Sequence, residues 1–301
     1  MKIKDYLSLG EVTYFTEKSD FDAWRLLVNN WLAIAAIFAV VGLFPNVLTI
    51  IVGTILLGGR QLGLSVLMHE CGHRSLFKTP WLNDVIGQWL CALPVMNDMP
   101  SYARGHLKHH KSAGTEDDPD LKNYRAYPIS KESFRRKVIR DLSGQTGFKL
   151  LNFIVRGTAT SMSSEKREGT RPLYLQLGVQ LTLFALLWLS GYAWLYLLWA
   201  GAYLTSFMLF IRLRQVAEHA AVPDLFDLDP RLNTRTVIPR WWERVVLAPN
   251  MVNYHMEHHF MASVPCYKLK ALHRLLRDQN ALDDMPRFVG YPAVLRHTVA
   301  L

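Results

Sequence analysis

The chain has 301 residues, half of them hydrophobic, and a formal net charge of +9 at pH 7. The apolar residues gather in two blocks separated by a polar, strongly basic stretch, which argues against a soluble protein and predicts an integral membrane protein. No basic motif with interleaved aromatic residues is present, which argues against nucleic acid as a partner and favours anionic lipid or an acidic protein.

Four segments are each long enough to cross a bilayer as a helix, at about 20 residues per crossing. They form two hairpins with short, uncharged turns: 26–44 with 47–67, and 173–189 with 192–211. The second segment contains Arg60 and several glycines. Because a charge that faces lipid is costly, we expect the last third of this segment to face protein.

The other apolar stretches are too short or too polar to cross. Residues 81–96 contain Asp84 and Pro94, so we expect a buried or interfacial helix there. Residues 267–278, YKLKALHRLLRD, place leucines at helical spacing between basic residues, which predicts an amphipathic helix on the membrane surface. The start of the chain, MKIKDYLSLGEVTYF, lacks a continuous apolar core, so we expect no removable signal peptide. The cysteines show no CxxC pairing, which predicts small buried residues without disulfides: Cys71, Cys91 and Cys266.

Two hairpins place the N-terminus and the segments 68–171 and 212–301 on one side of the membrane. About fifteen Lys and Arg lie between Arg104 and Arg171, so by the positive-inside rule this side is the cytoplasm. We therefore expect an all-α integral protein of the plasma or inner membrane, with a single domain over residues 1–301. The parts expected outside the membrane are a cytoplasmic helical cap of residues 68–171 and 212–265, and an amphipathic C-terminal segment of residues 266–301.

Nine of the 11 histidines fall in four tight groups, each just outside an apolar segment on the predicted cytoplasmic side. Residues three or four apart on a helix share a face, so the groups with several histidines each aim their imidazoles in one direction. Neutral imidazole is the commonest metal ligand, and a site without clustered cysteines favours iron, zinc or copper over calcium or magnesium. The candidate ligands are His69, His73, His106, His109, His110, His219, His255, His258 and His259. We expect the other two, His273 and His297, to be ordinary hydrogen-bonding or interfacial side chains.

The run HECGH at 69–73 also matches the helix motif of zinc peptidases, in which two histidines bind zinc and the glutamate is the general base. Such a site needs three protein ligands and a water, which leaves most of the clustered histidines without a purpose. Nine ligands suit two metal ions better than one. Polar residues near the proposed ligands are candidates for orienting an imidazole, with a solvated interfacial side chain as the alternative: Glu70, Glu218, Glu257 and Asn253.

The order HxxxH, HxxHH and, after the second hydrophobic hairpin, another HxxHH resembles the integral-membrane fatty acid desaturase and hydroxylase family. The boxes read HECGH at 69–73, HLKHH at 106–110 and HMEHH at 255–259, with His219 in AEH as the additional histidine. The resemblance covers about residues 31–265. It implies a non-haem di-iron centre, held by the nine histidines, that uses molecular oxygen and two electrons to break unactivated C–H bonds of a lipid chain.

The DDPD stretch at 117–120 is in keeping with this resemblance. Members of the family commonly place a water-mediated polar ligand one turn before the extra histidine, and that position is Gln215 here. The implied activity is desaturation of a long acyl chain, with hydroxylation of a lipid, alkane or terpenoid on the same site as the alternative. An intramembrane zinc peptidase and a non-catalytic metal or haem binder are the remaining alternatives.

The resemblance also implies a separate electron donor of the ferredoxin, rubredoxin or cytochrome b5 type. The sequence offers one basic stretch, around residues 135–140, as a predicted dock for an acidic carrier. Contact of this stretch with anionic lipid is the alternative. Its basic residues are Arg135, Arg136, Lys137 and Arg140.

Overall fold

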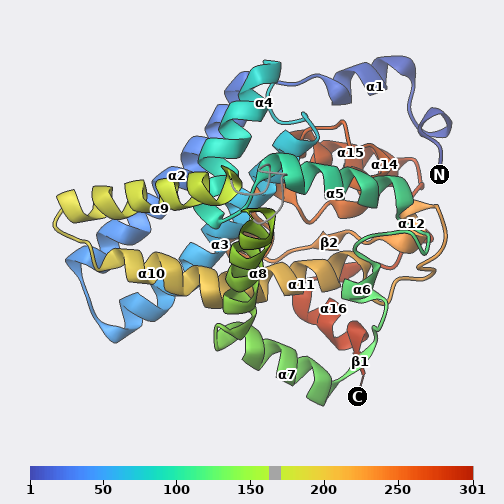
Figure 1. Cartoon of the computed structure of the whole chain (residues 1–301). Helices are drawn as coiled ribbons and strands as arrows, with labels where there is room; N and C mark the ends of the chain where they lie inside the picture. Colours follow the sequence, from blue (N-terminus) through green and yellow to red (C-terminus); the bar gives the residue numbers. More distant parts are fainter. Residues whose placement is uncertain (163–170, 301) are drawn as a thin grey trace.

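The computed structural model describes residues 1–162 and 171–300, which form a mostly helical chain with two very short sheets (Figure 1). Part of the expected cytoplasmic cap, residues 163–170, lies outside the described residues. Helices α2 (Asp20–Leu43) and α3 (Val47–Gly72) form the first long pair. The turn between them is set by Asn46, whose side chain accepts a hydrogen bond from the backbone N–H of Thr49 at 3.1 Å and so caps α3.

The second long pair consists of α9 (Arg171–Leu189) and a continuous helix over residues 195–219. This helix is made of α10 (Leu195–Ala202), the π-helical turn η5 (Tyr203–Phe207) and α11 (Met208–His219). Both turns lie at the left of Figure 1, and the two chain ends lie at the right. Four helices, α2, α3, α9 and this continuous helix, are long and apolar enough to cross a membrane, as the sequence predicts.

The remaining elements are short and connect or cover these four helices. The α-helices among them are α1 (Leu9–Thr16), α4 (Pro80–Ile86), α5 (Met99–Ser112), α6 (Leu121–Tyr124), α7 (Lys131–Leu142), α8 (Gln145–Met162), α12 (Pro230–Asn233), α13 (Trp241–Val246), α14 (His255–Phe260), α15 (Cys266–Asp278) and α16 (Tyr291–Thr298). The 3-10 turns are η1 (Ile3–Asp5), η3 (Leu93–Val95) and η6 (Pro249–Met251). Two parallel strand pairs complete the fold: β1 (Ile129–Ser130) with β4 (Val299–Ala300), and β2 (Val237–Ile238) with β3 (Phe288–Val289).

The last third of the segment 47–67 is buried against protein, as its charge and glycines predict, and the buried part of α3 extends from Leu57 to Cys71. The guanidinium of Arg60 donates to the backbone oxygen of Val245 and, at 3.4 Å, to the side chain of Asn30. At Gly58 a side-chain carbon would lie only 2.8 Å from the backbone nitrogen of Phe207. A glycine is therefore needed for the close approach of α3 to η5.

The predicted helix over 81–96 is broken into three pieces: α4, the π-helical segment η2 (Gly87–Ala92) and η3. One face of these pieces is buried, whereas Trp81 and Trp89 are exposed. Pro94 has no N–H to donate within a helix, which accounts for the change to a 3-10 turn and the end of the helical stretch at Val95.

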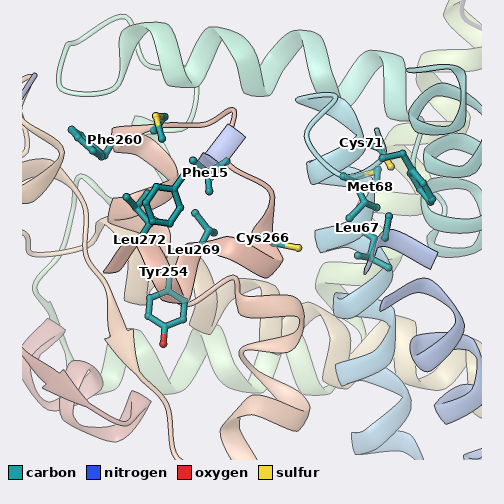
Figure 2. Close-up of a cluster of buried hydrophobic side chains, with 14 of the residues drawn as sticks. Phe15, Leu67, Met68, Cys71, Tyr254, Phe260, Cys266, Leu269 and Leu272 are labelled. Atoms are coloured by element: carbon teal, nitrogen blue, oxygen red, sulfur yellow. The ribbon is translucent and has the colours of Figure 1, made fainter. Parts of the chain in front are cut away.

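One buried hydrophobic cluster joins the last turns of α3 to α14 and α15 (Figure 2). Leu269, Leu272 and Leu276 of α15 belong to this cluster and are at most 2% exposed. The expectation of a helix lying on the membrane surface was therefore wrong for its apolar face, which the rest of the protein covers. An amphipathic pattern shows that one face is buried but not what covers it. The cysteines are all buried and free, as predicted.

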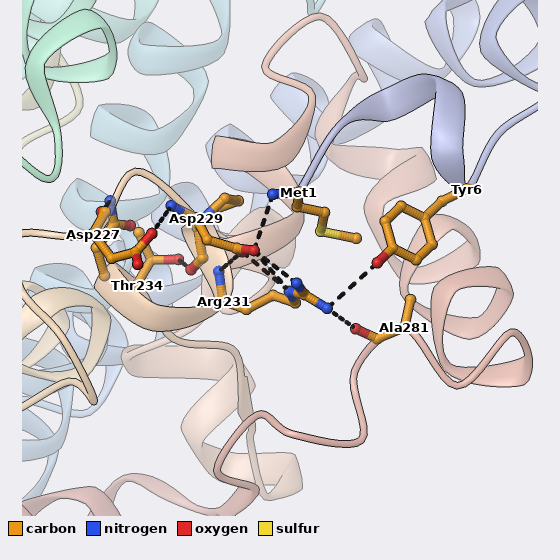
Figure 3. A network of polar contacts seen from close by, with 9 residues as sticks. Met1, Tyr6, Asp227, Asp229, Arg231, Thr234 and Ala281 are labelled. Atoms are coloured by element: carbon orange, nitrogen blue, oxygen red, sulfur yellow. Dashed lines mark hydrogen bonds and ion pairs between the residues drawn. The ribbon is translucent and has the colours of Figure 1, made fainter.

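A polar network ties the start of the chain to the segment after α11 (Figure 3). The carboxylate of Asp229 accepts from the Met1 amine at 2.9 Å and pairs with the Arg231 guanidinium at 2.7 Å. Arg231 also donates to the backbone oxygen of Ala281 at 3.1 Å. The N-terminal segment is thereby fastened to the part of the fold that carries α12 and α15.

Candidate metal centre

Four elements bring the nine candidate histidines together. His69 lies at the C-terminal end of α3 and His73 directly follows that helix; α5 carries three, the last residue of α11 is one, and α14 carries three. On α14, Met256 between the histidines and Phe260 directly after them face the hydrophobic core, so the three histidines face the other way. Helical spacing sets the face on each element, and the fold brings these faces into one common region.

The histidines form two groups of four whose ligand atoms all lie within 4.8 Å of one another. The first group takes residues from α3, α5 and α14, and the second takes residues from α5, α11 and α14. Each group therefore combines histidines from three elements. The first group is His69, His73, His106 and His258, and the second is His109, His219, His255 and His259.

The ninth histidine, His110, lies where the two groups meet. Its Nε2 atom is 3.0 Å from Nε2 of His106 and 2.9 Å from Nε2 of His258, both in the first group. Its ring also stacks on that of His259 in the second group, with 4.2 Å between the ring centroids. All nine candidate ligands thus converge, and the two groups are immediate neighbours.

Within each group, two ring nitrogens lie close enough together to bind the same metal ion. His69 and His258 have their Nε2 atoms 2.9 Å apart, and His219 and His255 have theirs 2.8 Å apart. Two nitrogens bound at right angles to an ion, each at about 2.1 Å, would be about 3.0 Å apart. Nε2 of His73 and Nε2 of His259 are buried and have no hydrogen-bond partner within the described part of the chain. A buried polar atom without a partner is costly, and a bound ion would supply one.

The buried imidazoles are held in the neutral form that binds metals. Burial lowers the pKa of His73 to about 4 and that of His110 to about 2, and neighbouring imidazoles add to the effect. The same cause holds the pKa values of four others well below the usual range: His106, His255, His258 and His259. At neutral pH their lone pairs are therefore available to a cation.

Several rings are fixed through their second nitrogen by residues that the sequence analysis did not assign. Nδ1 of His109 lies 2.8 Å from the carboxylate of Asp118, which also accepts from the hydroxyl of Tyr124. Nδ1 of His69 lies 3.1 Å from the hydroxyl of Tyr102. Such contacts fix the tautomer and the orientation of a ligand ring. The DDPD motif drew attention to the Asp118 region, but only the folded loop reveals which carboxylate meets a histidine.

The expected orienting residues make different contacts. Glu218 approaches the site, with one carboxylate oxygen 3.5 Å from Nδ1 of His255 and 3.2 Å from the Arg214 guanidinium. Gln215 lines a cavity that also contains His69. Asn253 donates to the backbone oxygen of Val237 at 3.0 Å.

Glu70 and Glu257 are buried and brace the elements that carry the ligands. The Glu70 carboxylate accepts from the Ser75 hydroxyl at 3.0 Å and from the backbone N–H of Cys266 at 2.9 Å, which ties α3 to α15. Glu257 accepts from the Thr236 hydroxyl and lies 2.5 Å from Nδ1 of His273, a histidine outside both groups. His297, the other histidine outside them, lies 3.0 Å from the backbone oxygen of Ala221.

A cavity of about 540 Å³ reaches the first histidine group. Its walls come from α3, α5, α8, α9, η5 and α11, and they are mostly apolar. His69 and Tyr102 line it beside the metal-ligand candidates, together with Arg214 and Gln215. Its volume is within the range of about 300–1,000 Å³ that is usual for small-molecule sites.

Comparison with known proteins gives consistent matches. A family model described as fatty acid desaturase matches residues 45–291. Dihydrorhizobitoxine desaturase of Bradyrhizobium elkanii is 27% identical over 232 residues, which cover 71% of this chain and 64% of the relative. The sn-1 acyl-lipid omega-3 desaturase (ferredoxin) of Nostoc sp. (strain 36) is 24% identical over 258 residues, with 79% and 70% covered. The sn-1 oleoyl-lipid 12-desaturase of Synechocystis sp. is 25% identical over 245 residues, with 73% and 66% covered. The aligned parts thus span about two thirds of the length of these relatives.

Proposed function

Because the chain belongs to the fatty acid desaturase family, we propose that it is a membrane oxidoreductase that introduces a double bond into a long acyl chain. The reaction would use a pair of iron ions, molecular oxygen and electrons from a separate protein. The observation that carries this proposal is the pair of adjacent four-histidine groups. A site for a single ion would leave the buried nitrogens of one of these groups without an ion to bind.

Each proposed ion has its own set of ligands. The first would be held by the group around His69 and the second by the group around His109. His110 is within 3.0 Å of two nitrogens of the first group, which supports its assignment there. The family supports iron as the metal. Bound iron would supply the redox chemistry with oxygen that breaks unactivated C–H bonds.

The protein would contribute positioning and the exclusion of water. The apolar walls of the cavity provide a place for an acyl chain, and His69 on its lining sets the chain beside the first ion site. The contacts of Tyr102, Asp118 and Glu218 would hold the ligand rings in place while the substrate binds. Two adjacent methylenes lying next to this wall would be the reacting groups.

Hydroxylation on the same site stays the alternative reaction, because the two outcomes share ligands, oxygen and electrons. The zinc peptidase alternative has little support. A general-base glutamate must reach a metal-bound water. The carboxylate of Glu70 instead accepts hydrogen bonds from Ser75 and from Cys266, and its nearest approach to Nε2 of His69 is 3.9 Å.

The orientation in the membrane is proposed from charge. The positive-inside rule supports a cytoplasmic location for the histidine-bearing ends of the long helices, on the inner face of the plasma or inner membrane. An electron donor would then be a cytoplasmic carrier. The name of the Nostoc relative specifies ferredoxin, which supports a carrier of that type.

Metal analysis and lipid analysis test the proposal together. We expect about two iron ions per purified chain, and loss of iron and of activity in His109→Ala and His258→Ala, which remove one ligand from each group. Mass spectrometry of lipids from cells with and without the protein should show a product lighter by two hydrogens. A product heavier by one oxygen would indicate hydroxylation, and one zinc ion with unchanged lipids would contradict the proposal.

A further inference from the structure

A basic cleft of about 320 Å³ lies between α15, α13 and strands β2 and β3. It shares no lining residue with the cavity beside His69. No Asp or Glu occurs among its described lining residues. Its basic residues are Arg244, Lys270, Arg274, Arg277 and Arg287.

Three of these charges are free to meet a partner. Arg277 pairs with its neighbour Asp278 at 3.0 Å, and Arg287 pairs with Asp283 at 3.3 Å. Within residues 1–162 and 171–300, no ion pair involves the other three basic residues of the cleft: Arg244, Lys270 and Arg274. A concave surface with unpaired positive charge attracts acidic partners and speeds their association.

The floor of the cleft is connected to the proposed ion sites. His273 and Tyr254 both line the cleft, and their ring centroids are 5.2 Å apart. Nδ1 of His273 lies 2.5 Å from the carboxylate of Glu257. Glu257 is on α14 between His255 and His258, and Tyr254 directly precedes that helix. One hydrogen bond therefore separates the cleft from the helix that carries three of the nine histidines.

We propose that this cleft, and not the basic helix α7, is the docking site of an acidic one-electron carrier protein. This inference rests on the proposed function. Forming a double bond from two adjacent methylenes removes two hydrogens while oxygen is reduced to two molecules of water. The balance requires two further electrons and two protons, so two reduced carriers are oxidised by one electron each in every turnover.

Helix α7 has a less direct connection to the site. Its Asp141 pairs with Arg212, which lies about two helical turns before His219. The cleft, in contrast, contacts α14 itself through His273. The cleft therefore has the shorter chain of contacts to a histidine-bearing helix, which favours it over α7 as the place where a carrier binds.

Binding measurements test the docking site without turnover. The full chain is embedded in vesicles of neutral phosphatidylcholine and titrated with a fluorescently labelled, acidic plant-type [2Fe–2S] ferredoxin. We expect the pair Lys270→Glu with Arg274→Glu to weaken binding roughly tenfold or more and to reduce its salt dependence. The matched pair Arg135→Glu with Arg136→Glu on α7 makes the same change in charge and should bind as the unaltered chain does.

The neutral pair Lys270→Gln with Arg274→Gln serves as the control for misfolding. It should show an intermediate loss of binding and an unchanged unfolding temperature. Unaltered binding by the charge-reversed cleft pair, loss of binding by the α7 pair alone, or no ferredoxin binding by the unaltered chain would overturn the proposal. So would a cleft pair that loses affinity only for anionic phosphatidylglycerol vesicles, since the cleft would then contact lipid.

Failure of the proposed function would look different. Reduced methyl viologen supplies electrons without docking, and it should drive double-bond formation equally in the unaltered chain and in the cleft pair. Ferredoxin-dependent formation should be lost only in the cleft pair. If methyl viologen drives no reaction in the unaltered chain, the oxidoreductase assignment fails while the binding result stands on its own.

Discussion

At the residue scale, the histidines depend on neighbours that hold the far side of each ring. Asp118 is the clearest case, since it is buried, lies 2.8 Å from Nδ1 of His109 and also accepts from Tyr124. The ionised form of Asp118 is favoured, because its hydrogen bonds with His109 and Tyr124 lower its pKa against the opposing effect of burial. A negative charge at this position makes the imidazole a stronger donor to a cation on its other side.

Replacing this carboxylate with an amide tests that role. We expect Asp118→Asn to lower iron affinity or activity about 10–100-fold, since the amide keeps the shape but removes the charge. Iron content after dialysis against a chelator is the measurement. The control is Asp117→Asn, which changes an exposed neighbour and should retain iron. Equal retention by both variants would show that Asp118 does not tune the site.

The residues of the site could be predicted from sequence only in part. Spacing of three and four places histidines on one helical face, which pointed to eight of the nine candidates, while His219 was singled out by its place after the second hydrophobic hairpin. It cannot indicate how faces from different elements combine, and each group in fact mixes three elements, as with His69 beside His258. Contacts such as Asn233, whose backbone oxygen lies 3.2 Å from Nδ1 of His219, depend on chain folding and leave no signal in composition.

At the element scale, α3 joins the membrane part to the site and is packed on several sides. Gly58 lies against η5, and Gly63 lies against Asn30 of α2. The same helix ends in the histidines of the first box. Close packing over its last two thirds therefore fixes the position of two proposed ligands as well as the fold.

A methyl group at Gly58 would meet backbone and side-chain atoms of η5. We expect Gly58→Ala to lower the free energy of unfolding by about 1–3 kcal/mol, because overpacking forces the helices apart. The control is Gly178→Ala on α9, where no atom lies within 4 Å of the added carbon. Unfolding temperatures in detergent compare the two, and an equal or higher value for Gly58→Ala would contradict close packing at this position.

A substitution on α3 also tests whether the cavity beside His69 binds the acyl chain. Ser65 lines it one helical turn before His69. We expect Ser65→Phe to shift activity towards shorter acyl chains without loss of iron, since the larger side chain fills space near the ion site. Val245→Phe, on a separate apolar pocket, should leave chain-length preference unchanged. Loss of iron in Ser65→Phe, or an unchanged preference, would argue against this cavity as the acyl site.

Sequence patterns located the helices better than they identified what each helix packs against. The apolar faces of α3 and α15 were both recognised, and both are covered by protein. For α3, the charge of Arg60 correctly indicated that protein and not lipid surrounds this part of the helix. For α15, lysines and arginines between leucines fit a membrane surface equally well, and only the long-range packing with α3 and α14 decides the matter.

At the scale of the whole molecule, the orientation in the membrane is the main open prediction. The three native cysteines are buried, so a single exposed cysteine can report the side on which it lies. We expect a membrane-impermeant maleimide to label Ser190→Cys, at the turn after α9, in intact cells. Lys111→Cys, on α5 beside the histidines, should be labelled only after the membrane is opened. The reverse pattern would place the site on the outside.

The two longest helices also make the geometry of the site depend on the thickness of the bilayer. Val47–Gly72 and Leu195–His219 have 26 and 25 residues, which is about 37–39 Å of helix against a hydrocarbon layer of about 30 Å. His69 and His219 lie at their ends and belong to different groups. A thinner or thicker bilayer would change the tilt of each helix and so move one group against the other. The acyl-chain length of the host lipids would thus change the rate of the reaction. Cells that alter those lipids would change this rate without changing the amount of protein.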